Sequence, residues 1–485
     1  MNYRKIFHYL GIILLVEALL MILPVIIGLL YRERIVWCFL VTMALLGAVG
    51  FLFYRRKPSK NSLYSKEGYV IVALAWVLMS LFGALPFFIC GNIPNYLDAF
   101  FETVSGFTTT GATILTEIET MPKCLLFWRS FTHFIGGMGI LVFVIAIMPK
   151  TEGSSIHIMR AEVPGPTMGK LVSKLRMSAR ILYGIYCGMT ALLFLLLFAG
   201  GMPAFDSITT AFATAGTGGF SVLNNSIEGY REMAGVNSNY IEVVLSFGMI
   251  FFGVNFNLYY LILMKHGKHA VKDEEMHWYA GIIAVAVILI TAVLTVTKHP
   301  FGESLRLSLF QVASIISTTG FSSTDFDLWP SFTKIILVIL MFIGSCAGST
   351  GGGLKISRVA IMIKQSFRSV KKASNPRRVE MVKLNGRAVD EEIVHSTLSY
   401  FSMAMLLTAL SIIIVSIDGF DLTSSTTSVI ACFNNVGPGL SLVGPTGNYF
   451  DFSPLSKIVL CFDMLAGRLE LLPMLLLFRS FGSNK

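Results

Sequence analysis

Four short segments of the chain carry residues that could bind a monovalent cation through backbone oxygens. Each is a half-apolar stretch that ends in a glycine turn, and the turns are Thr109, Thr110 and Gly111; Thr217, Gly218 and Gly219; Thr318, Thr319 and Gly320; and Asn435, Val436 and Gly437. Glycine adopts backbone angles that other residues avoid, so successive carbonyls can face one axis. A ring of carbonyls can replace the hydration shell of a monovalent cation, whereas divalent selection would bring Asp or Glu into the turn. None of these turns contains a carboxylate, so we predict a backbone filter for a monovalent cation.

The glycines that end the four turns are regularly spaced, at intervals of 108, 101 and 117 residues. A unit of helix, re-entrant segment and helix therefore recurs along the chain. Irregular backbone at membrane depth is tolerated only where protein encloses it or where it lines water, so the four segments should converge on one axis. The short helix before each turn would point its partly negative C-terminal end at the centre, which favours a cation there.

The composition is that of an integral membrane protein. The chain has 485 residues, of which 54% are hydrophobic and 14% are charged, with a mean hydropathy of +0.71. Soluble domains carry about 25% charged residues, and a helical span needs about 20 apolar residues. Ten such spans are expected, at residues 7–30, 35–54, 69–90, 126–148, 180–199, 241–264, 278–297, 334–363, 394–417 and 455–478. They leave no room for a large soluble catalytic domain.

We therefore expect an all-α membrane fold with two N-terminal helices and four parallel repeats around one pseudo-tetrameric pore. Each repeat would consist of a first helix (M1), a pore helix (P) and a second helix (M2). The expected boundaries are 1–62 for the N-terminal pair and 63–165, 166–272, 273–385 and 386–485 for the repeats.

The distribution of basic residues predicts the orientation in the membrane. Lys and Arg gather at one end of the predicted spans, near residues 4–5, 55–66, 150–180, 265–272 and 364–387 and at Arg479. This end is expected to be cytoplasmic, together with both chain termini. The four re-entrant segments hold 13 acidic and four basic residues. The outer mouth should be electronegative and should concentrate cations, although ordinary depletion of basic residues outside the cell accounts for part of the asymmetry.

The second helix of the third repeat is predicted to break. It contains Gly344, Gly348, Gly351, Gly352 and Gly353 within an apolar span, and each glycine costs about 1 kcal/mol in a helix relative to alanine. A nucleotide-binding P-loop requires Lys directly after the last glycine, and Leu354 stands there instead. A flexible gating loop beneath the filter and close packing against a neighbouring helix remain as the two interpretations.

Charged residues within the spans are costly and should face the pore or one another. The last helix carries Asp463, Arg468 and Glu470. Arg468 would place a positive charge below the filter, or alternatively form a structural ion pair with Glu470 or another acidic neighbour. Arg129 and Glu242 lie nearer to helix ends and are interpreted as interfacial anchors. The histidines show no spacing that repeats between units, and no role is assigned to them.

With these turns and this repeat, the sequence resembles the TrkH/KtrB potassium-uptake family, and its two N-terminal helices are typical of the TrkH branch. The resemblance covers the whole chain and implies one filter glycine per repeat, at Gly111, Gly219, Gly320 and Gly437. It implies potassium as the transported ion, since a serine in the first of these positions goes with sodium permeation in this family. The fourth turn departs from the threonine-rich pattern with Asn435, Val436 and Pro438, so the ring should be only pseudo-fourfold.

The resemblance also implies partners and a location. The protein is expected to be a homodimer in the bacterial inner membrane, with a cytosolic ring of nucleotide-binding RCK-type subunits docked on the basic segments 150–180 and 364–392. The resemblance also favours the interpretation of residues 344–353 as a loop that obstructs the pore. Potassium would be the transported ion, with no organic cofactor on this chain and no nucleic-acid partner.

Two other classes of function are weighed against a channel-like pore. An intramembrane enzyme would need a recurrent His, Asp or Ser constellation, which the sequence lacks, so no enzymatic activity is expected. A symporter that couples uptake to H⁺ or Na⁺ by alternating access typically uses inverted repeats, whereas these repeats are parallel. Channel-like conduction and ion-coupled uptake both stay open at this point.

Overall fold

The computed structural model describes residues 3–56, 65–139, 175–265, 267–297, 300–377, 380–471 and 473–474. Within these residues the chain is mostly helical, which confirms the expected all-α class. The described strands form one small antiparallel hairpin, β1 (Lys383–Leu384) and β2 (Arg387–Ala388). Residues 150–174 of the predicted basic segment 150–180, the end of the span 126–148 and Arg479 lie outside the described residues.

The chain begins with an antiparallel pair of long helices. α1 (Tyr3–Leu20) continues into α2 (Ile22–Leu30), and α3 (Val36–Tyr54) runs back along them. Gly11 and Gly50 lie at the contact, because a Cβ at Gly11 would be 2.7 Å from Gly50 O. Small residues let membrane helices approach closely, as here. These helices correspond to the two predicted N-terminal spans.

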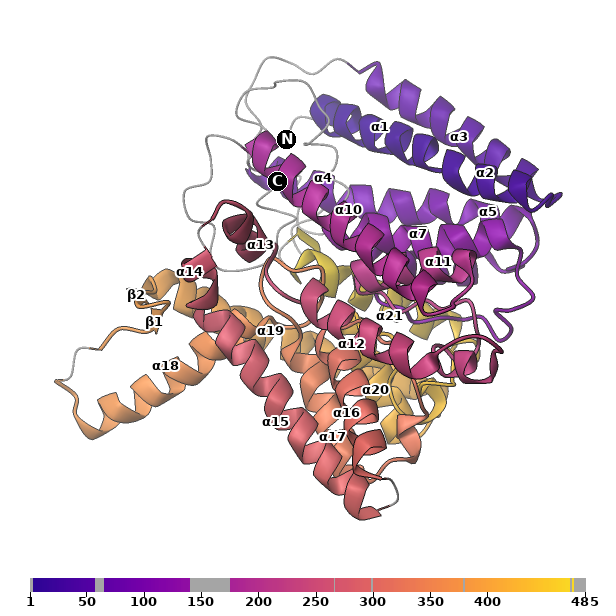
Figure 1. The fold of residues 1–485 in the computed structure, drawn as a ribbon. Helices are drawn as coiled ribbons and strands as arrows, with labels where there is room; N and C mark the ends of the chain where they lie inside the picture. Colours follow the sequence, from indigo (N-terminus) through magenta and orange to yellow (C-terminus); the bar gives the residue numbers. More distant parts are fainter. Residues whose placement is uncertain are drawn as a thin grey trace.

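The order of first helix, short helix and second helix then recurs four times (Figure 1). The first helices are α4 (Ser65–Gly83) with α5 (Leu85–Ile89), α10 (Leu175–Ala199), α15 (Glu274–Thr297) and α19 (Glu391–Val415). The pore helices are α6 (Tyr96–Phe107), α11 (Ala204–Gly216), α16 (Phe301–Ile316) and α20 (Leu422–Phe433). The second helices are α7 (Lys123–Met138), α12 (Ser238–Phe252) with α13 (Phe256–Leu263), α17 (Ser331–Ile343) with α18 (Ile356–Ser374), and α21 (Pro454–Leu469).

Short elements complete the connections. They are α14 (Gly267–Val271) and the 3₁₀ turns η2 (Glu228–Glu232), η3 (Phe326–Leu328), η4 (Ser416–Asp418) and η5 (Ser441–Val443). The β-hairpin lies at the start of α15, where Asn385 N–H donates to Glu274 Oε2 at 2.9 Å. From this end of the bundle α18 extends outward (Figure 1).

Several of the ten expected spans are short or broken within the residues that the structure describes. Six described helices are long and apolar enough to cross a membrane, and α12 with α13, which meet at 89°, make a seventh if the bent pair is counted as one span. The second helices α7, α17 and α21 have only 16, 13 and 16 residues. The span predicted at 241–264 breaks at Gly253, and the span at 334–363 breaks between Ile343 and Ile356, as the glycines there predicted.

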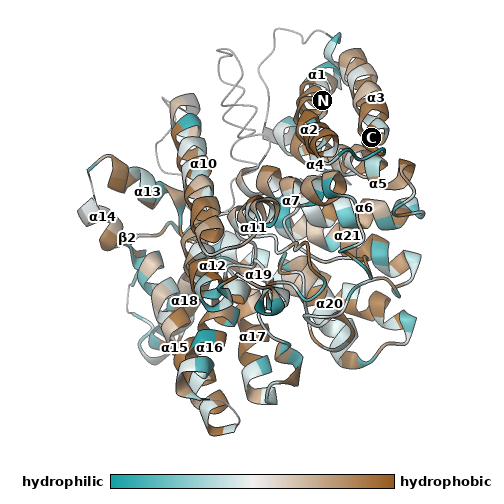
Figure 2. Cartoon of the chain, turned by 45° about the vertical axis from the view of Figure 1, so that its right-hand side comes forward, coloured by the Kyte–Doolittle hydropathy of each residue, from teal (hydrophilic) through white to brown (hydrophobic). Residues whose placement is uncertain are grey.

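The apolar outer faces of the helices around the bundle match a lipid environment. Hydrophobic residues run along α10, α15 and α17 (Figure 2). Only 22% of the α10 span and 28% of the α15 span are buried within the chain. The pore helices are the reverse, because nine of the twelve α6 residues are buried. The four pore helices therefore form the interior of the bundle, surrounded by the longer helices.

Candidate ion pathway

All four glycine turns have the same backbone conformation. Each glycine has a positive φ, from 76° at Gly219 to 95° at Gly437. The residue two positions earlier is also left-handed in every turn, with φ of 56°, 55°, 59° and 55° at Thr109, Thr217, Thr318 and Asn435. Residues other than glycine rarely adopt such angles. The same unusual backbone angles therefore recur in all four turns of this chain.

The left-handed residues end the pore helices in the same way. Thr109 N–H donates to Gly106 O at 3.1 Å, and Thr110 N–H donates to Ser105 O at 2.9 Å. The N–H groups of Gly218, Thr319 and Val436 make the bond equivalent to that of Thr110, each at 2.8 Å. This is the Schellman pattern of helix termination. It stops each pore helix and turns the chain so that the next residues run along a new direction.

The four turns form a closed ring. A Cβ added at Gly111 would lie 2.1 Å from Gly218 O in the second unit, and one at Gly219 would lie 2.0 Å from Thr319 O in the third. A Cβ at Gly320 would lie 2.1 Å from Val436 O in the fourth unit, and one at Gly437 would lie 2.6 Å from Thr110 O in the first. Each glycine thus meets the carbonyl of the next unit, and the fourth unit returns to the first.

A buried ion pair braces the first turn from behind. Arg129 on α7 is 2% exposed, and its Nε donates to Glu102 Oε1 on pore helix α6 at 2.6 Å. Its Nη1 donates to Ser221 O, just after the second turn, at 2.8 Å, and its guanidinium stacks on Phe220 at 3.6 Å. The interpretation of Arg129 as an interfacial anchor is therefore wrong, because the side chain joins units 1 and 2 inside the bundle.

Charged groups also join the remaining units. Glu242 on α12 has a fully buried side chain and accepts from Arg306 on pore helix α16 at 2.7 Å, so it too is not an interfacial anchor. Lys457 on α21 donates to Asp98 on α6 at 2.7 Å, which joins units 4 and 1. Between units 3 and 4, Ser441 N–H donates to Asp327 Oδ2 at 3.1 Å.

His133 is a further brace that the sequence analysis left without a role. The side chain is fully buried, and its Nδ1 lies 2.8 Å from Gly106 O at the end of the first pore helix. Phe220 N–H donates to His133 Nε2 at 3.3 Å, directly after the second turn. The neutral tautomer with a proton on Nδ1 satisfies both contacts. His133 thus sets the distance between the first pore helix and the second turn.

Breaking the Arg129 pair should destabilise the protein strongly. Arg129→Gln would leave Glu102 buried without its cation, a change that costs about 3–5 kcal/mol in buried pairs. Arg231→Gln is the matched control, because Arg231 also contacts a buried carboxylate, that of Glu242, but is 29% exposed. We expect a clearly lower melting temperature for Arg129→Gln than for the control in detergent. Equal melting temperatures would contradict the brace.

The break between α17 and α18 lies directly beneath the third and fourth turns. Gly352 N–H donates to Thr318 Oγ1 at 2.6 Å. A Cβ at Gly351 would be 2.7 Å from Ser317 O, and one at Gly352 would be 2.4 Å from Asn434 O. Gly344, Gly348 and Gly353 have φ values of 69°, 71° and 74°. These glycines allow the segment 344–355 (the glycine loop) to approach the ends of two pore helices.

The glycine loop is held more firmly than a flexible segment would be. Glu275, near the start of α15, accepts from Ala347 N–H at 2.7 Å and from Ser357 N–H at 3.0 Å through one oxygen. Cys346 N–H donates to Gly253 O at 3.1 Å, and Phe256 N–H donates to Gly348 O at 3.0 Å. The bend between α12 and α13 therefore frees backbone groups that bind the loop. Glu275 was not singled out in the sequence.

Arg468 on α21 joins three units below the ring. Its Nη1 donates to Thr350 O in the glycine loop at 2.6 Å, and its Nη2 donates to Gly136 O and Gly137 O on α7 at 2.6 and 2.8 Å. Glu470 accepts from Arg358 at 2.6 Å. Asp463 faces α19 rather than the pore, because its Oδ1 accepts from Ser411 at 2.9 Å. The expectation that all three charges face the pore or one another is wrong for Asp463.

A second basic side chain, Lys355, lies at the end of the glycine loop. Lys355 is 2% exposed and donates to Gly351 O. Gly351, Lys355, Arg358 and Arg468 line one small pocket beneath the ring. Three basic side chains therefore lie beneath the ring, and each donates to a carbonyl of the glycine loop, Arg358 to Leu354 O at 3.5 Å.

The fold and the ring together define the class of this protein: an all-α membrane protein in which four pore-helix units surround one axis. Residues 34–485 match the family model TrkH, described as a cation transport protein. The chain is 36% identical to the Trk system potassium uptake protein TrkH of Salmonella typhimurium and 35% identical to that of Escherichia coli K12, over 99% of each sequence. It superposes on the crystal structure of the potassium transporter TrkH from Vibrio parahaemolyticus with a TM-score of 0.87 and 31% identity, covering 98% of both chains. The chain belongs to the TrkH family.

Proposed function

We propose that the protein moves potassium ions across the membrane through the ring formed by the four turns. The observation that carries this proposal is the closure of the ring, in which each filter glycine meets the carbonyl before the next filter glycine. The relatives named as potassium uptake proteins support potassium as the ion. The filter residues are Thr109 to Gly111, Thr217 to Gly219, Thr318 to Gly320 and Asn435 to Gly437, with potassium bound by their carbonyls.

The fourth turn makes the proposed filter only pseudo-fourfold. Asn435 Nδ2 donates to Thr110 Oγ1 at 2.9 Å and to Met464 O at 2.9 Å. In the first and third units the hydroxyls beside the turns pair instead, as Thr108 with Thr110 at 2.8 Å and Ser317 with Thr319 at 2.7 Å. The amide therefore links the fourth turn to the first and to α21. We expect fewer equivalent ion sites than in a tetrameric channel.

The glycine loop, with Gly344, Gly348, Gly351, Gly352 and Gly353, is proposed to be the gate. It lies under two of the four turns, and a cation that leaves the ring inward would meet it and the charges of Arg468 and Lys355. The hydrogen bond from Arg468 to Thr350 O holds the loop in this obstructing position. Movement requires the loss of this bond and of the bonds to Glu275. A bistable element of this kind is what a gate needs.

The test is single-channel recording of the purified protein in planar bilayers. Unitary currents that reverse at the potassium equilibrium potential are expected, with rubidium also permeant and sodium far less so. Uptake that follows a pH or sodium gradient without unitary currents would instead favour an ion-coupled symporter. Because one chain contributes all four turns, the currents should be obtained with this chain alone.

We further propose a homodimer in the bacterial inner membrane, with both termini cytoplasmic and regulation by a nucleotide-binding RCK-type ring. The described part of the basic region 364–392 supports a soluble partner. The last turn of α18 contains Lys371 and Lys372, and the outer half of this helix is exposed away from the bundle (Figure 1). A basic, water-exposed helix favours association with an acidic partner surface.

A further inference from the structure

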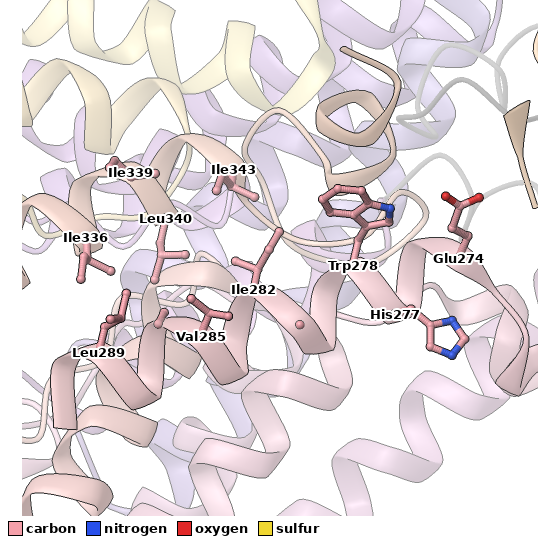
Figure 3. Close-up of a pocket in the computed structure, with 12 residues that line it drawn as sticks. Glu274, His277, Trp278, Ile282, Val285, Leu289, Ile336, Ile339, Leu340 and Ile343 are labelled. Carbon is pink, nitrogen blue, oxygen red and sulfur yellow. The ribbon is translucent and has the colours of Figure 1, made fainter. Parts of the chain in front are cut away.

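An apolar groove lies between α15 and α17, on the outside of the third unit and away from the central axis. Its volume is about 580 Å³, within the range of about 300–1,000 Å³ that is usual for ligand sites. Aliphatic side chains of α15, among them Ile282, Val285 and Leu289, face Ile336, Ile339 and Ile343 of α17 (Figure 3). Glu274, His277 and Trp278 lie at one end. The groove thus has a long apolar wall and a single polar end.

The surroundings identify what fills this groove. α15 spans the membrane and keeps most of its surface outside the chain, with Val285, Ile288 and Ile339 each more than half exposed. Such a face meets the hydrocarbon of the bilayer. Tryptophan is enriched where membrane helices reach the lipid headgroups, and Trp278 stands at the polar end. The groove is apolar along its length and polar at one end. A phospholipid that lies parallel to α15 has the same order, with its acyl chain along the apolar walls and its headgroup at the polar end.

We propose that one acyl chain of a membrane phospholipid occupies the groove between α15 and α17. The apolar walls recognise the hydrocarbon chain, and the headgroup lies beside Trp278 and His277. Glu274, at this end, forms an ion pair with Lys364. The positive charge of Lys364 offsets the negative charge of the carboxylate, so Glu274 does not repel a phosphate. Recognition should therefore depend on the chain more than on the headgroup.

The groove adjoins both elements that hold the glycine loop. α17 ends at Ile343, a groove residue, and the loop begins at Gly344. Glu275, which accepts from two loop N–H groups, follows the groove residue Glu274. A lipid chain in the groove would therefore fix the spacing of α15 and α17. If the loop is the gate, a point that rests on the proposed function, this lipid stabilises its closed position.

Gly281 provides a sharp test because it lines the groove and has no neighbouring atom within 4 Å of an added Cβ. Gly281→Phe would fill the groove from within. Gly188→Phe on α10 is the matched control. Gly188 is also exposed and also has open space around an added Cβ, but it does not line the groove. Val285→Trp is a second filling variant, to be used if Gly281→Phe fails to fold.

The measurement is native mass spectrometry of the purified full chain, loaded with palmitoyl-oleoyl phosphatidylethanolamine or phosphatidylglycerol and then delipidated stepwise. Wild type and Gly188→Phe should retain one more phospholipid per chain than Gly281→Phe, with either headgroup. Equal retention in all three proteins would overturn the proposal. A changed oligomeric state in Gly281→Phe with unchanged lipid would also overturn it, and would assign the groove to a second copy of the chain.

Rubidium uptake into liposomes separates the lipid site from the gate. Loss of the lipid together with raised uptake in Gly281→Phe, and neither change in Gly188→Phe, supports both parts. Loss of the lipid with unchanged uptake keeps the lipid site and overturns its coupling to the loop.

Discussion

Gly111→Ser is expected to raise sodium permeation relative to potassium by about tenfold, which corresponds to about 1.4 kcal/mol between the two barriers. Gly111 has a φ of 83°, an angle that serine tolerates poorly. The new Cβ would also lie 2.1 Å from Gly218 O, so this carbonyl must move. Displacing one oxygen of the ring loosens its fit to dehydrated potassium. The measurement is the sodium-to-rubidium ratio of tracer flux in proteoliposomes.

The ring offers a graded control for this prediction. A Cβ at Gly437 would lie 2.6 Å from Thr110 O, a looser contact than the 2.0–2.1 Å found at the other three turns. Gly437→Ser should therefore change the flux ratio less than Gly111→Ser does. Gly184→Ser, on the outer face of α10 with open space around it, should leave the ratio unchanged. An unchanged ratio in well-folded Gly111→Ser would remove the first turn from the filter.

The special backbone conformation of the four glycine turns was the part of the site that the sequence could predict, and their role as a filter stays a prediction. Glycines at regular intervals identify the turns because only glycine takes the required angles without strain. The left-handed Thr109, Thr217, Thr318 and Asn435 were less apparent, because threonine rarely adopts such angles. A signal was nevertheless present, since each of them stands two residues before a filter glycine.

The braces between units could not be predicted because their partners lie far apart in the chain. Glu242 and Arg306 are separated by 64 residues, and Lys457 and Asp98 by 359. Their pairing depends on the closure of the ring, which spacing alone does not specify. The prediction that Arg129 is an interfacial anchor was wrong because a charged residue inside an apolar span is usually buried among partners.

The second broken helix did leave a local signal. Gly253 ends α12, and Asn255 caps α13 by accepting from Asn257 N–H at 3.0 Å. Asparagine is among the preferred N-cap residues, so Gly-Val-Asn within an apolar run indicates a stop and a new start. The bend matters because Gly253 O and Phe256 N–H, exposed by it, bind the glycine loop. Two broken helices therefore support each other.

Arg468→Ala is expected to raise rubidium uptake several-fold. Its removal frees three contacts at once, because Arg468 donates to Thr350 O, Gly136 O and Gly137 O from one guanidinium. A charged hydrogen bond of this kind contributes about 1.5–3 kcal/mol. Its loss also removes a positive charge that repels cations below the ring. Both effects lower the barrier to conduction, while the filter above keeps its geometry.

Shortening the glycine loop by deletion within Gly348 to Gly353 should act on the same barrier. The deletion removes the segment beneath the third and fourth turns, including the N–H of Gly352 that donates to Thr318. Combined with Arg468→Ala, it should give less than the sum of the separate effects, because contacts that share one barrier are not additive.

Arg368→Ala, on the outer half of α18 away from the loop, is the control for the loss of an arginine side chain, because Arg368 pairs with Glu391 instead. Unchanged or reduced uptake in well-folded single variants, with melting temperatures close to wild type, would assign the loop to packing. Raised uptake with an unchanged sodium-to-rubidium ratio would place the gate in the loop and selectivity in the ring.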